Sequence, residues 1–277
     1  MLMNEIDEFI KYLGQIKHTS YNTQVSYRRD LTKLSAFLEK QSISRWEKVT
    51  ETSLNLYALQ LEKDGLKASS ISRNIAAIRS FCQYMLRNGK LSADPSQRLK
   101  SPKIEKKVPV ALSRQEVERL LREPSGDTPK EMRDRAMLML LYATGIRVSE
   151  LIQLTMDDLN LSLGYIVCKD RTIPFSEPVK AAIQAYLKDA RGYFVKNQES
   201  RYLFTNCSGN PMSRQGFWKL MKYYGEKIGL SQVLTPHVLR HSMAVHMLEE
   251  GVGMQRLQQI LGHSDISTTQ MYAYFKQ

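Results

Sequence analysis

The sequence of 277 residues predicts a mainly α-helical protein with two domains and one small β-sheet in the second. Apolar residues recur at three- and four-residue spacings over most of the chain, and one stretch alternates as a β-hairpin does. A basic, proline-containing stretch interrupts the helical pattern. We therefore expect a small helical bundle over residues 1–95, a basic linker over 96–110, and a mainly helical domain with a small sheet over 111–277.

The first domain is expected to contain four amphipathic helices, because apolar residues fall on one face of each. The helix that follows "KASSIS" ends before Gly89, and Cys82 is expected to lie in a core. The apolar positions of the four helices are Ile6, Phe9 and Leu13; Leu31, Leu34 and Leu38; Leu54, Tyr57 and Leu61; and Ile71, Ile75, Ile78, Phe81 and Met85. Four such helices make a compact bundle.

The linker segment "DPSQRLKSPKIEKKVPVALS" contains three prolines and a run of basic residues. Proline breaks regular structure, so the segment is expected to run over the surface. Its charges are either solvated or lie against phosphate groups, and the sequence leaves both readings open.

The second domain is expected to begin with a helix, because Ser113 to Glu116 match a capping box. The apolar helix "RAMLMLLYAT" follows and ends at Gly145, and "RVSELIQL" opens another. The stretch "GYIVCKDRTIPF" predicts a β-hairpin, and the remainder returns to helices. In "LTPHVLRHSMAVHMLEEG", Thr235 can cap a helix that ends near Gly251.

The formal net charge of +12 favours a polyanionic partner, and nucleic acid is the leading candidate. A basic enzyme with no nucleic-acid partner is the alternative. The sequence shows no apolar run long enough to span a membrane and no secretory signal, which predicts a cytoplasmic protein. Three cysteines without paired spacing are expected to be free thiols rather than disulfides or a zinc site.

His237 and Arg240 lie three residues apart near the start of the predicted helix. They therefore project from one face, where backbone N–H groups and the helix dipole also favour an anion. This pattern predicts a phosphate site, and a surface pair without a role is the alternative.

Three motifs occur together in one order: "ATGIRVSEL", "HVLRHSMAVHML" and "LGHSDISTTQMY". This ordered set resembles the tyrosine recombinase family, in particular its Xer-type members. The resemblance extends over nearly the whole chain. It implies that the first half is a SAM-like core-binding domain and the second a catalytic domain, which together form a C-shaped clamp on DNA.

The resemblance implies six catalytic residues, and their chemistry suits phosphoryl transfer without a metal or a cofactor. Two guanidinium groups can bind the nonbridging oxygens, where charge accumulates in the transition state. A tyrosine attacks to form a 3′-phosphotyrosyl bond, and a lysine protonates the 5′-hydroxyl that leaves. One histidine moves the tyrosine proton and the other donates a hydrogen bond. The set is Arg147, Lys169, His237, Arg240, His263 and Tyr272.

The hairpin departs from the family pattern, because relatives show a longer "GKGxKxR" turn where this chain has "CKDRTIP". Counting forward from Arg147 and counting back from "RTIP" both end on Lys169, which we expect to be the general acid. After Tyr272 only "AYFKQ" remains, whereas many relatives continue for another helix that couples subunits. Either coupling uses other surfaces or the sequence is cut short.

Further positions carry two interpretations each. Tyr274 is the rival to Tyr272, but on a helix the two would point in different directions, so Tyr274 is expected to pack. Glu150 either supports the active-site arginine and lysine or lies on a helix surface. In "MSRQGFWKLMK", the core residues are expected to be Phe217, Trp218 and Leu220. The positions expected to face DNA, with a solvated face as the alternative, are Lys67, Arg73, Arg79, Arg214 and Gln215.

The resulting hypothesis is a site-specific DNA recombinase that resolves chromosome or plasmid dimers. The expected partner is double-stranded DNA with paired inverted half-sites, bound by a homotetramer on two sites or by a heterotetramer with a paralogous recombinase. No membrane partner is expected. The alternatives are an integrase or excisionase of a mobile element, a tyrosine topoisomerase that relaxes one duplex, and a noncatalytic DNA-binding protein.

Overall fold

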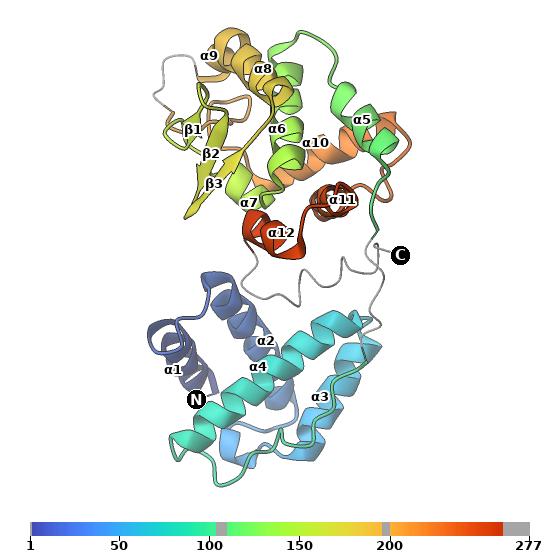
Figure 1. Ribbon diagram of the computed structural model, residues 1–277. Helices are drawn as coiled ribbons and strands as arrows, with labels where there is room; N and C mark the ends of the chain where they lie inside the picture. The colour runs from blue at the N-terminus through green and yellow to red at the C-terminus, as the bar shows by residue number, and fades with distance from the viewer. Residues whose placement is uncertain (1, 104–109, 196–199, 263–277) are drawn as a thin grey trace. The chain divides into compact units, whose positions relative to one another are not determined.

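The computed structural model describes residues 2–103, 110–195 and 200–262. The chain divides into two compact units, Met1–Lys107 and Val108–Gln277. Helices dominate both units and the one named sheet is small, which confirms the predicted fold class (Figure 1). The predicted domain limits at residues 95 and 110 stay a prediction.

The first unit is the four-helix bundle that the periodicity predicts. Its core places the ring of Phe81 against both Phe9 and Trp46, and the Trp46 Nε1–H donates to the backbone oxygen of Leu2 at 3.1 Å. Cys82 is buried, as expected. The helices are α1 (Leu2–Gln15), α2 (Tyr21–Lys40), α3 (Glu51–Lys63) and α4 (Ala68–Arg87), with a short 3-10 turn at Trp46–Lys48.

The second unit has its own core, in which α6 (Pro129–Thr144) packs against helices that precede and follow it in the chain. A turn of π-helix, Tyr186–Ala190, joins α8 to α9. The helices are α5 (Arg114–Arg122), α6 (Pro129–Thr144), α7 (Val148–Leu151), α8 (Glu177–Ala185), α9 (Arg191–Val195), α10 (Arg214–Lys227), α11 (Pro236–Glu249) and α12 (Met254–Leu261).

Predicted caps form at two helices of this unit. The Ser113 side chain accepts from the Glu116 N–H, while the Glu116 carboxylate accepts from the Ser113 N–H at 2.7 Å, which completes the capping box of α5. The Thr235 hydroxyl accepts from the Val238 N–H at the start of α11. These contacts satisfy backbone donors that have no partner inside the helix.

The sheet consists of three antiparallel strands, β1 (Leu159–Asn160), β2 (Tyr165–Cys168) and β3 (Arg171–Pro174). The predicted hairpin is the β2–β3 pair, and β1 is an addition that the sequence pattern did not indicate. Cys168 pairs with Arg171 and Ile166 with Ile173. Cross-strand partners share one face of a sheet, so Arg171 lies on the same face as the buried Ile166, Cys168 and Ile173.

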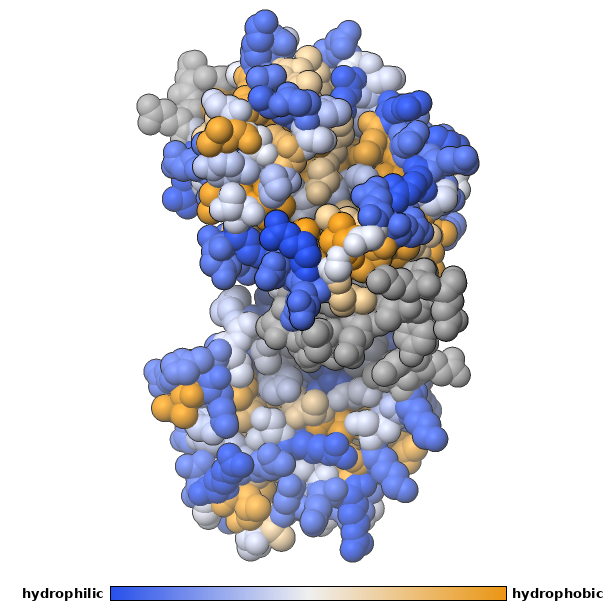
Figure 2. All heavy atoms as spheres, viewed as in Figure 1, coloured by the Kyte–Doolittle hydropathy of each residue, from blue (hydrophilic) through white to orange (hydrophobic). Residues whose placement is uncertain are grey.

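On the face shown in Figure 2, hydrophilic residues predominate, and hydrophobic residues are exposed between them on both units. Phe217 and Leu220 are buried as expected, but Trp218 is 50% exposed, so its predicted core position was wrong. Trp218 follows Phe217 on α10, and neighbouring helical positions point in different directions. Within the part of the chain described above, no helix is long and apolar enough to cross a membrane.

Candidate active site

Arg147 is positioned by the sharp end of α6. Gly145 caps α6 with a φ of +58°, a conformation that favours glycine, and a Cβ there would lie 1.8 Å from the Met243 side chain. Two residues later Arg147 is the N-cap residue of α7. Its side chain is 43% exposed, and its guanidinium donates to the Gly262 backbone oxygen at 3.3 Å.

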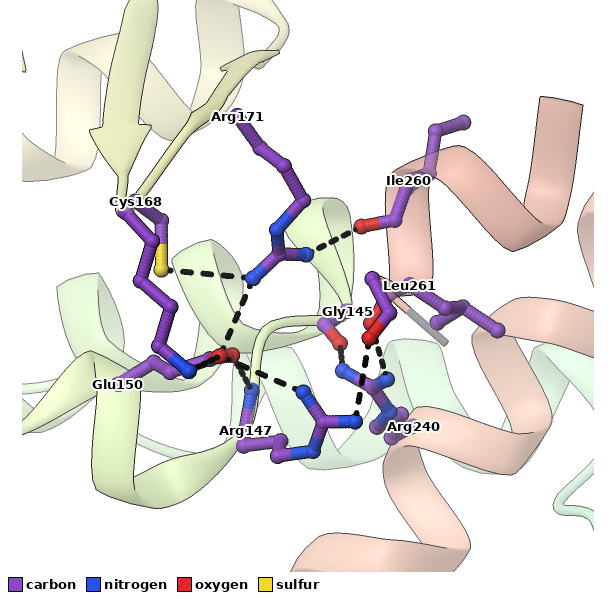
Figure 3. A network of polar contacts seen from close by, with 10 residues as sticks. Gly145, Arg147, Glu150, Cys168, Arg171, Arg240, Ile260 and Leu261 are labelled. Atoms are coloured by element: carbon purple, nitrogen blue, oxygen red, sulfur yellow. Dashed lines mark hydrogen bonds and ion pairs between the residues drawn. The ribbon is translucent and has the colours of Figure 1, made fainter. Parts of the chain in front are cut away.

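Glu150 lies at the centre of a cluster of cations (Figure 3). Its Oε2 accepts from the Arg147 backbone N–H at 2.8 Å. Its Oε1 lies 3.4 Å from both Arg147 Nη1 and Lys169 Nζ, and 3.2 Å from Arg171 Nη2. The residue is 7% exposed, so the surface-glutamate alternative does not hold.

The pKa of the Glu150 carboxyl reflects two opposing effects. Burial by itself disfavours the charged form and would raise the pKa. The Arg147 backbone N–H and the three neighbouring positive charges outweigh burial, so the pKa of Glu150 lies below its ordinary value. The carboxylate therefore stays charged at neutral pH and holds the cations in one place.

Lys169 lies in the two-residue turn between β2 and β3. Its φ of +58° is in the left-handed region that non-glycine residues avoid at a cost of about 1–2 kcal/mol. Its side chain is 69% exposed, and its ammonium contacts Glu150. The shortened turn thus places its one lysine beside the arginine cluster, in a conformation that the surrounding structure must hold.

Arg240 is nearly buried on the first turns of α11, with 7% exposure. Its guanidinium donates to the backbone oxygen of Gly145 through Nη1 and to that of Leu261 at 2.6 Å through Nη2. The same side chain therefore contacts both the end of α6 and the end of α12.

The last turn of α12 is bound by three arginines from three different elements. Arg171 donates to the Ile260 oxygen at 2.6 Å, Arg240 to Leu261, and Arg147 to Gly262. Carbonyl groups at a helix C-terminus carry partial negative charge, which favours cations there. These contacts bring Arg147 and Arg240 to successive carbonyls, so two of the predicted phosphate-binding groups lie close together.

An open groove of about 700 Å³ adjoins this cluster. Its lining includes Arg147, Lys169 and Arg171 together with three glutamines of α12, Gln255, Gln258 and Gln259. Glu150 and Asp170 also line the groove, so the three cationic side chains leave it with a small net positive charge, which favours an anionic ligand.

Of the predicted catalytic histidines and tyrosine, only His237 lies in the part of the chain that the structure describes. His237 is exposed in the first turn of α11, three residues before Arg240, as the helix prediction required. Its neighbour His241 is half-buried; burial, then the charges of His237 and Arg240, lower the pKa of His241. His263, Tyr272 and Tyr274 lie outside the described residues.

The residues predicted to face DNA fall into two groups. Lys67, at the start of α4, and Arg214 and Gln215, in the first turn of α10, are exposed. Arg73 instead pairs with the buried Asp30, and Arg79 donates to the Leu99 backbone oxygen. These contacts give both arginines a structural role within the first unit, and their contact with DNA stays a prediction.

Arg171 is a site residue that the sequence reasoning did not select. The motif "CKDRTIP" contains it, but only the pairing of Cys168 with Arg171 indicates that it faces inward. The signal that could have identified it is a charged residue on the apolar face of a predicted strand.

Comparison with known proteins identifies the family to which this fold belongs. A model of the phage integrase family matches residues 111–277, and a model of the phage integrase N-terminal SAM-like domain matches residues 6–89. The chain belongs to the phage integrase family. Its curated relatives include tyrosine recombinase XerD of Halalkalibacterium halodurans, 41% identical over 98% of this chain and 93% of the relative. Tyrosine recombinase XerC of Roseiflexus castenholzii is 38% identical over 98% of this chain and 89% of the relative.

Solved structures share this fold over nearly the whole chain. The XerA recombinase matches with a TM-score of 0.55 and 27% identity, covering 97% of this chain and 92% of that chain. The Tn1549 transposon integrase in complex with circular intermediate DNA matches with a TM-score of 0.78 at 21% identity, over 97% and 94% of the two chains. XerH bound to palindromic difH substrate has a TM-score of 0.74 at 18% identity, over 99% and 92%.

Proposed function

We propose that this protein cuts and rejoins DNA strands at specific sites through a covalent link to Tyr272. The observation that carries the proposal is the placement of two guanidinium groups, Arg147 and Arg240, at successive carbonyls beside an exposed lysine. Two forked, permanently charged donors suit a phosphodiester whose oxygens gain charge in the transition state. Relatives of about 40% identity that are named tyrosine recombinases support the same chemistry.

The proposed reaction replaces one phosphoester bond with another, so the energy of the DNA linkage is conserved. The Tyr272 oxygen attacks the phosphorus, His237 accepts the phenol proton, and the bond from phosphorus to the 5′-oxygen breaks. Lys169 gives that oxygen a proton, while Arg147, Arg240 and His263 hold the nonbridging oxygens. A 5′-hydroxyl of a second strand then reverses the attack and rejoins the DNA, so no ATP, metal or other cofactor is required.

The proposed assembly is a tetramer on two DNA sites, each with paired inverted half-sites. It is either a homotetramer or a heterotetramer with a paralogous recombinase. The proposed role is resolution of chromosome or plasmid dimers in the cytoplasm. The XerD and XerC names of the relatives favour this role over excision or integration of a mobile element.

Covalent capture tests the proposal without knowledge of the target. The protein is incubated with nicked duplexes made from random genomic fragments. After cleavage the short piece that carries the 5′-hydroxyl diffuses away, so the covalent intermediate cannot be reversed and accumulates. Adducts are recovered after denaturation, and the DNA-bound peptide is mapped. We expect DNA on Tyr272, no adduct with Tyr272→Phe, and a normal adduct with the control Tyr274→Phe.

The captured DNA also separates the alternatives. Recovery of one chromosomal or plasmid locus supports dimer resolution, whereas recovery of element ends supports a mobile-element enzyme. A Tyr272→Phe protein that still forms the adduct would falsify the assignment of the nucleophile. A wild-type protein that binds DNA but forms no adduct on any fragment would contradict the catalytic function itself.

A further inference from the structure

Arg171 connects three separate elements of the second unit through one guanidinium group. From β3 it donates to the Ile260 oxygen of α12 at 2.6 Å and to the Cys168 Sγ of β2 at 3.5 Å. It also pairs with Glu150 of α7 at 3.2 Å. Figure 3 shows these contacts converging on the one side chain.

Its burial distinguishes Arg171 from the other cations around Glu150. The Arg171 side chain is 13% exposed, against 43% for Arg147 and 69% for Lys169. Most of its surface is therefore covered by protein partners. Its geometry suits a group that holds other residues in place rather than one that binds the phosphate itself.

The Arg171 guanidinium also lies close against the backbone of Gly262. A Cβ at this position would lie 2.8 Å from the Arg171 Cζ and 2.9 Å from its Nε and Nη1. The planar group therefore packs directly on the backbone at the end of α12. Because that backbone continues into His263, Arg171 touches the last described residue before the segment that carries the proposed nucleophile.

We propose that Arg171 is a positioning residue: by attaching the β2–β3 turn to the end of α12, it sets the place of the Lys169 ammonium. The inference rests on the proposed strand cleavage. Glu150 Oε1 is shared by Arg147, Lys169 and Arg171. Without Arg171, the carboxylate attracts the other two cations more strongly, and the β2–β3 turn loses its attachment to Ile260. Lys169 is then drawn away from the leaving oxygen.

A sulfur-substituted substrate tests this role, because it removes the need for Lys169. In the ordinary substrate the bond from phosphorus to the 5′-oxygen breaks and Lys169 supplies a proton to that oxygen. If sulfur replaces this oxygen, the bond to sulfur breaks and a thiolate leaves without a proton, since thiols ionise far more readily than alcohols. A variant that has only misplaced the general acid should therefore recover on the sulfur substrate.

The measurement is single-turnover cleavage of both substrates, with DNA affinity and thermal unfolding measured in parallel. We expect Arg171→Gln to cleave the oxygen substrate about tenfold to a hundredfold more slowly, with unchanged DNA affinity, and the sulfur substrate at nearly the wild-type rate. Lys169→Ala should show the same pattern. The double variant should be no slower than Lys169→Ala alone, because both changes remove one function.

Arg191→Gln is the matched control. Arg191 is also half-buried and donates to two backbone oxygens, those of Ser200 and Tyr202 at 2.5 and 2.9 Å, but has no contact with Glu150 among the described residues. Arg191→Gln should lower the stability of the protein, but its cleavage rate should not recover selectively on the sulfur substrate. Arg171→Lys keeps the charge but not the fork, so its rate should lie between those of wild type and Arg171→Gln.

Two results would overturn the inference alone: Arg171→Gln at the wild-type rate on the oxygen substrate, or equal slowing on both substrates. If Arg171→Gln fails to fold, the same criteria apply to Arg171→Lys. A wild-type protein that cleaves neither substrate would overturn the proposed function and this inference with it.

Discussion

At the residue scale, the site depends on one buried carboxylate whose single negative charge is shared by several cationic side chains. Glu150 accepts a backbone N–H and contacts three positively charged side chains. Removing its charge would leave those cations close together without compensation. A buried partner of this kind is costly to lose, because the groups that remain keep their desolvation penalty.

We expect Glu150→Gln to lower the free energy of unfolding by about 2 kcal/mol at pH 7. Because the pKa of Glu150 is lower when folded than its ordinary value of 4.5, its charge stabilises the fold above about pH 4.5. That contribution is lost as the pH falls through the lowered folded-state pKa, so the difference between wild type and variant should shrink there. Urea unfolding from pH 7 to pH 3 measures it.

Glu177, which pairs with Lys180, supplies the control. Glu177 is 83% exposed, so Glu177→Gln should change the stability little at any of these pH values. A Glu150→Gln difference that stays constant or grows as the pH falls would contradict the proposed source of the stabilisation.

The sequence predicted the site residues that lie in recognisable short motifs. It missed Arg171, whose place in the site depends on strand pairing. Arg147, Lys169 and Arg240 were selected from ordered motifs, and the structure places all three at one cluster. Arg171 became visible only through its register with Cys168 and its contact with Ile260, 89 residues further along the chain. Contacts of that range follow from tertiary packing, which a local pattern does not encode.

At the element scale, the β2–β3 turn holds its lysine in an unfavourable backbone conformation. The φ of Lys169 is +58°, where glycine would meet no steric penalty. Unfavourable backbone conformations occur at functional sites when the side chain is needed there. Lys169 thus has an unfavourable backbone conformation and, at the same time, a proposed role in the chemistry.

We therefore expect Lys169→Gly to raise the free energy of unfolding by up to about 1 kcal/mol, because it relieves the left-handed conformation. The same variant should lose cleavage of the ordinary phosphodiester, because no ammonium remains to protonate the 5′-oxygen. Thermal unfolding and single-turnover cleavage measure the two effects.

Ser42→Gly is a matched control in the first unit. Ser42 is exposed and has a φ of +61°, so glycine relieves a similar conformation without touching the site. It should increase the stability and leave cleavage unchanged. If Lys169→Gly destabilises the protein while Ser42→Gly stabilises it, the lysine is favoured by contacts and its backbone is not strained.

The strongly periodic helices and the β2–β3 hairpin were predicted well, whereas two short elements were missed. The four helices of the first unit, the capped helices α5 and α11 and the β2–β3 hairpin all appear where the pattern placed them. Strand β1 has only two residues, and the π-helical turn after α8 continues a helix without a change in periodicity. Neither produces a repeat long enough to recognise.

At the scale of the whole molecule, the formal charge of +12 makes DNA binding sensitive to salt. Each phosphate neutralised by a cationic side chain releases a counterion, so the logarithm of the binding constant falls linearly with the logarithm of salt concentration. Arg214 and Gln215 are adjacent and exposed in the first turn of α10, but only one is charged.

We expect Arg214→Ala to weaken DNA binding and to reduce the salt slope by about one. Gln215→Ala should weaken binding without a change in slope, because a neutral side chain releases no counterion. Fluorescence anisotropy on a captured target duplex, over a range of salt concentrations, measures both. An unchanged slope for Arg214→Ala would show that this arginine does not neutralise a phosphate.

Two of the arginines on the last turn of α12, Arg147 and Arg240, also affect how readily a phosphate can be bound. Fixing a long side chain costs conformational entropy, up to about 2 kcal/mol for arginine. Arg147 and Arg240 are already hydrogen-bonded to the carbonyls of Gly262 and Leu261, which restricts their rotamers before a phosphate arrives. An arriving phosphate would therefore meet side chains that have little freedom left to lose, and most of the electrostatic attraction would remain available for binding.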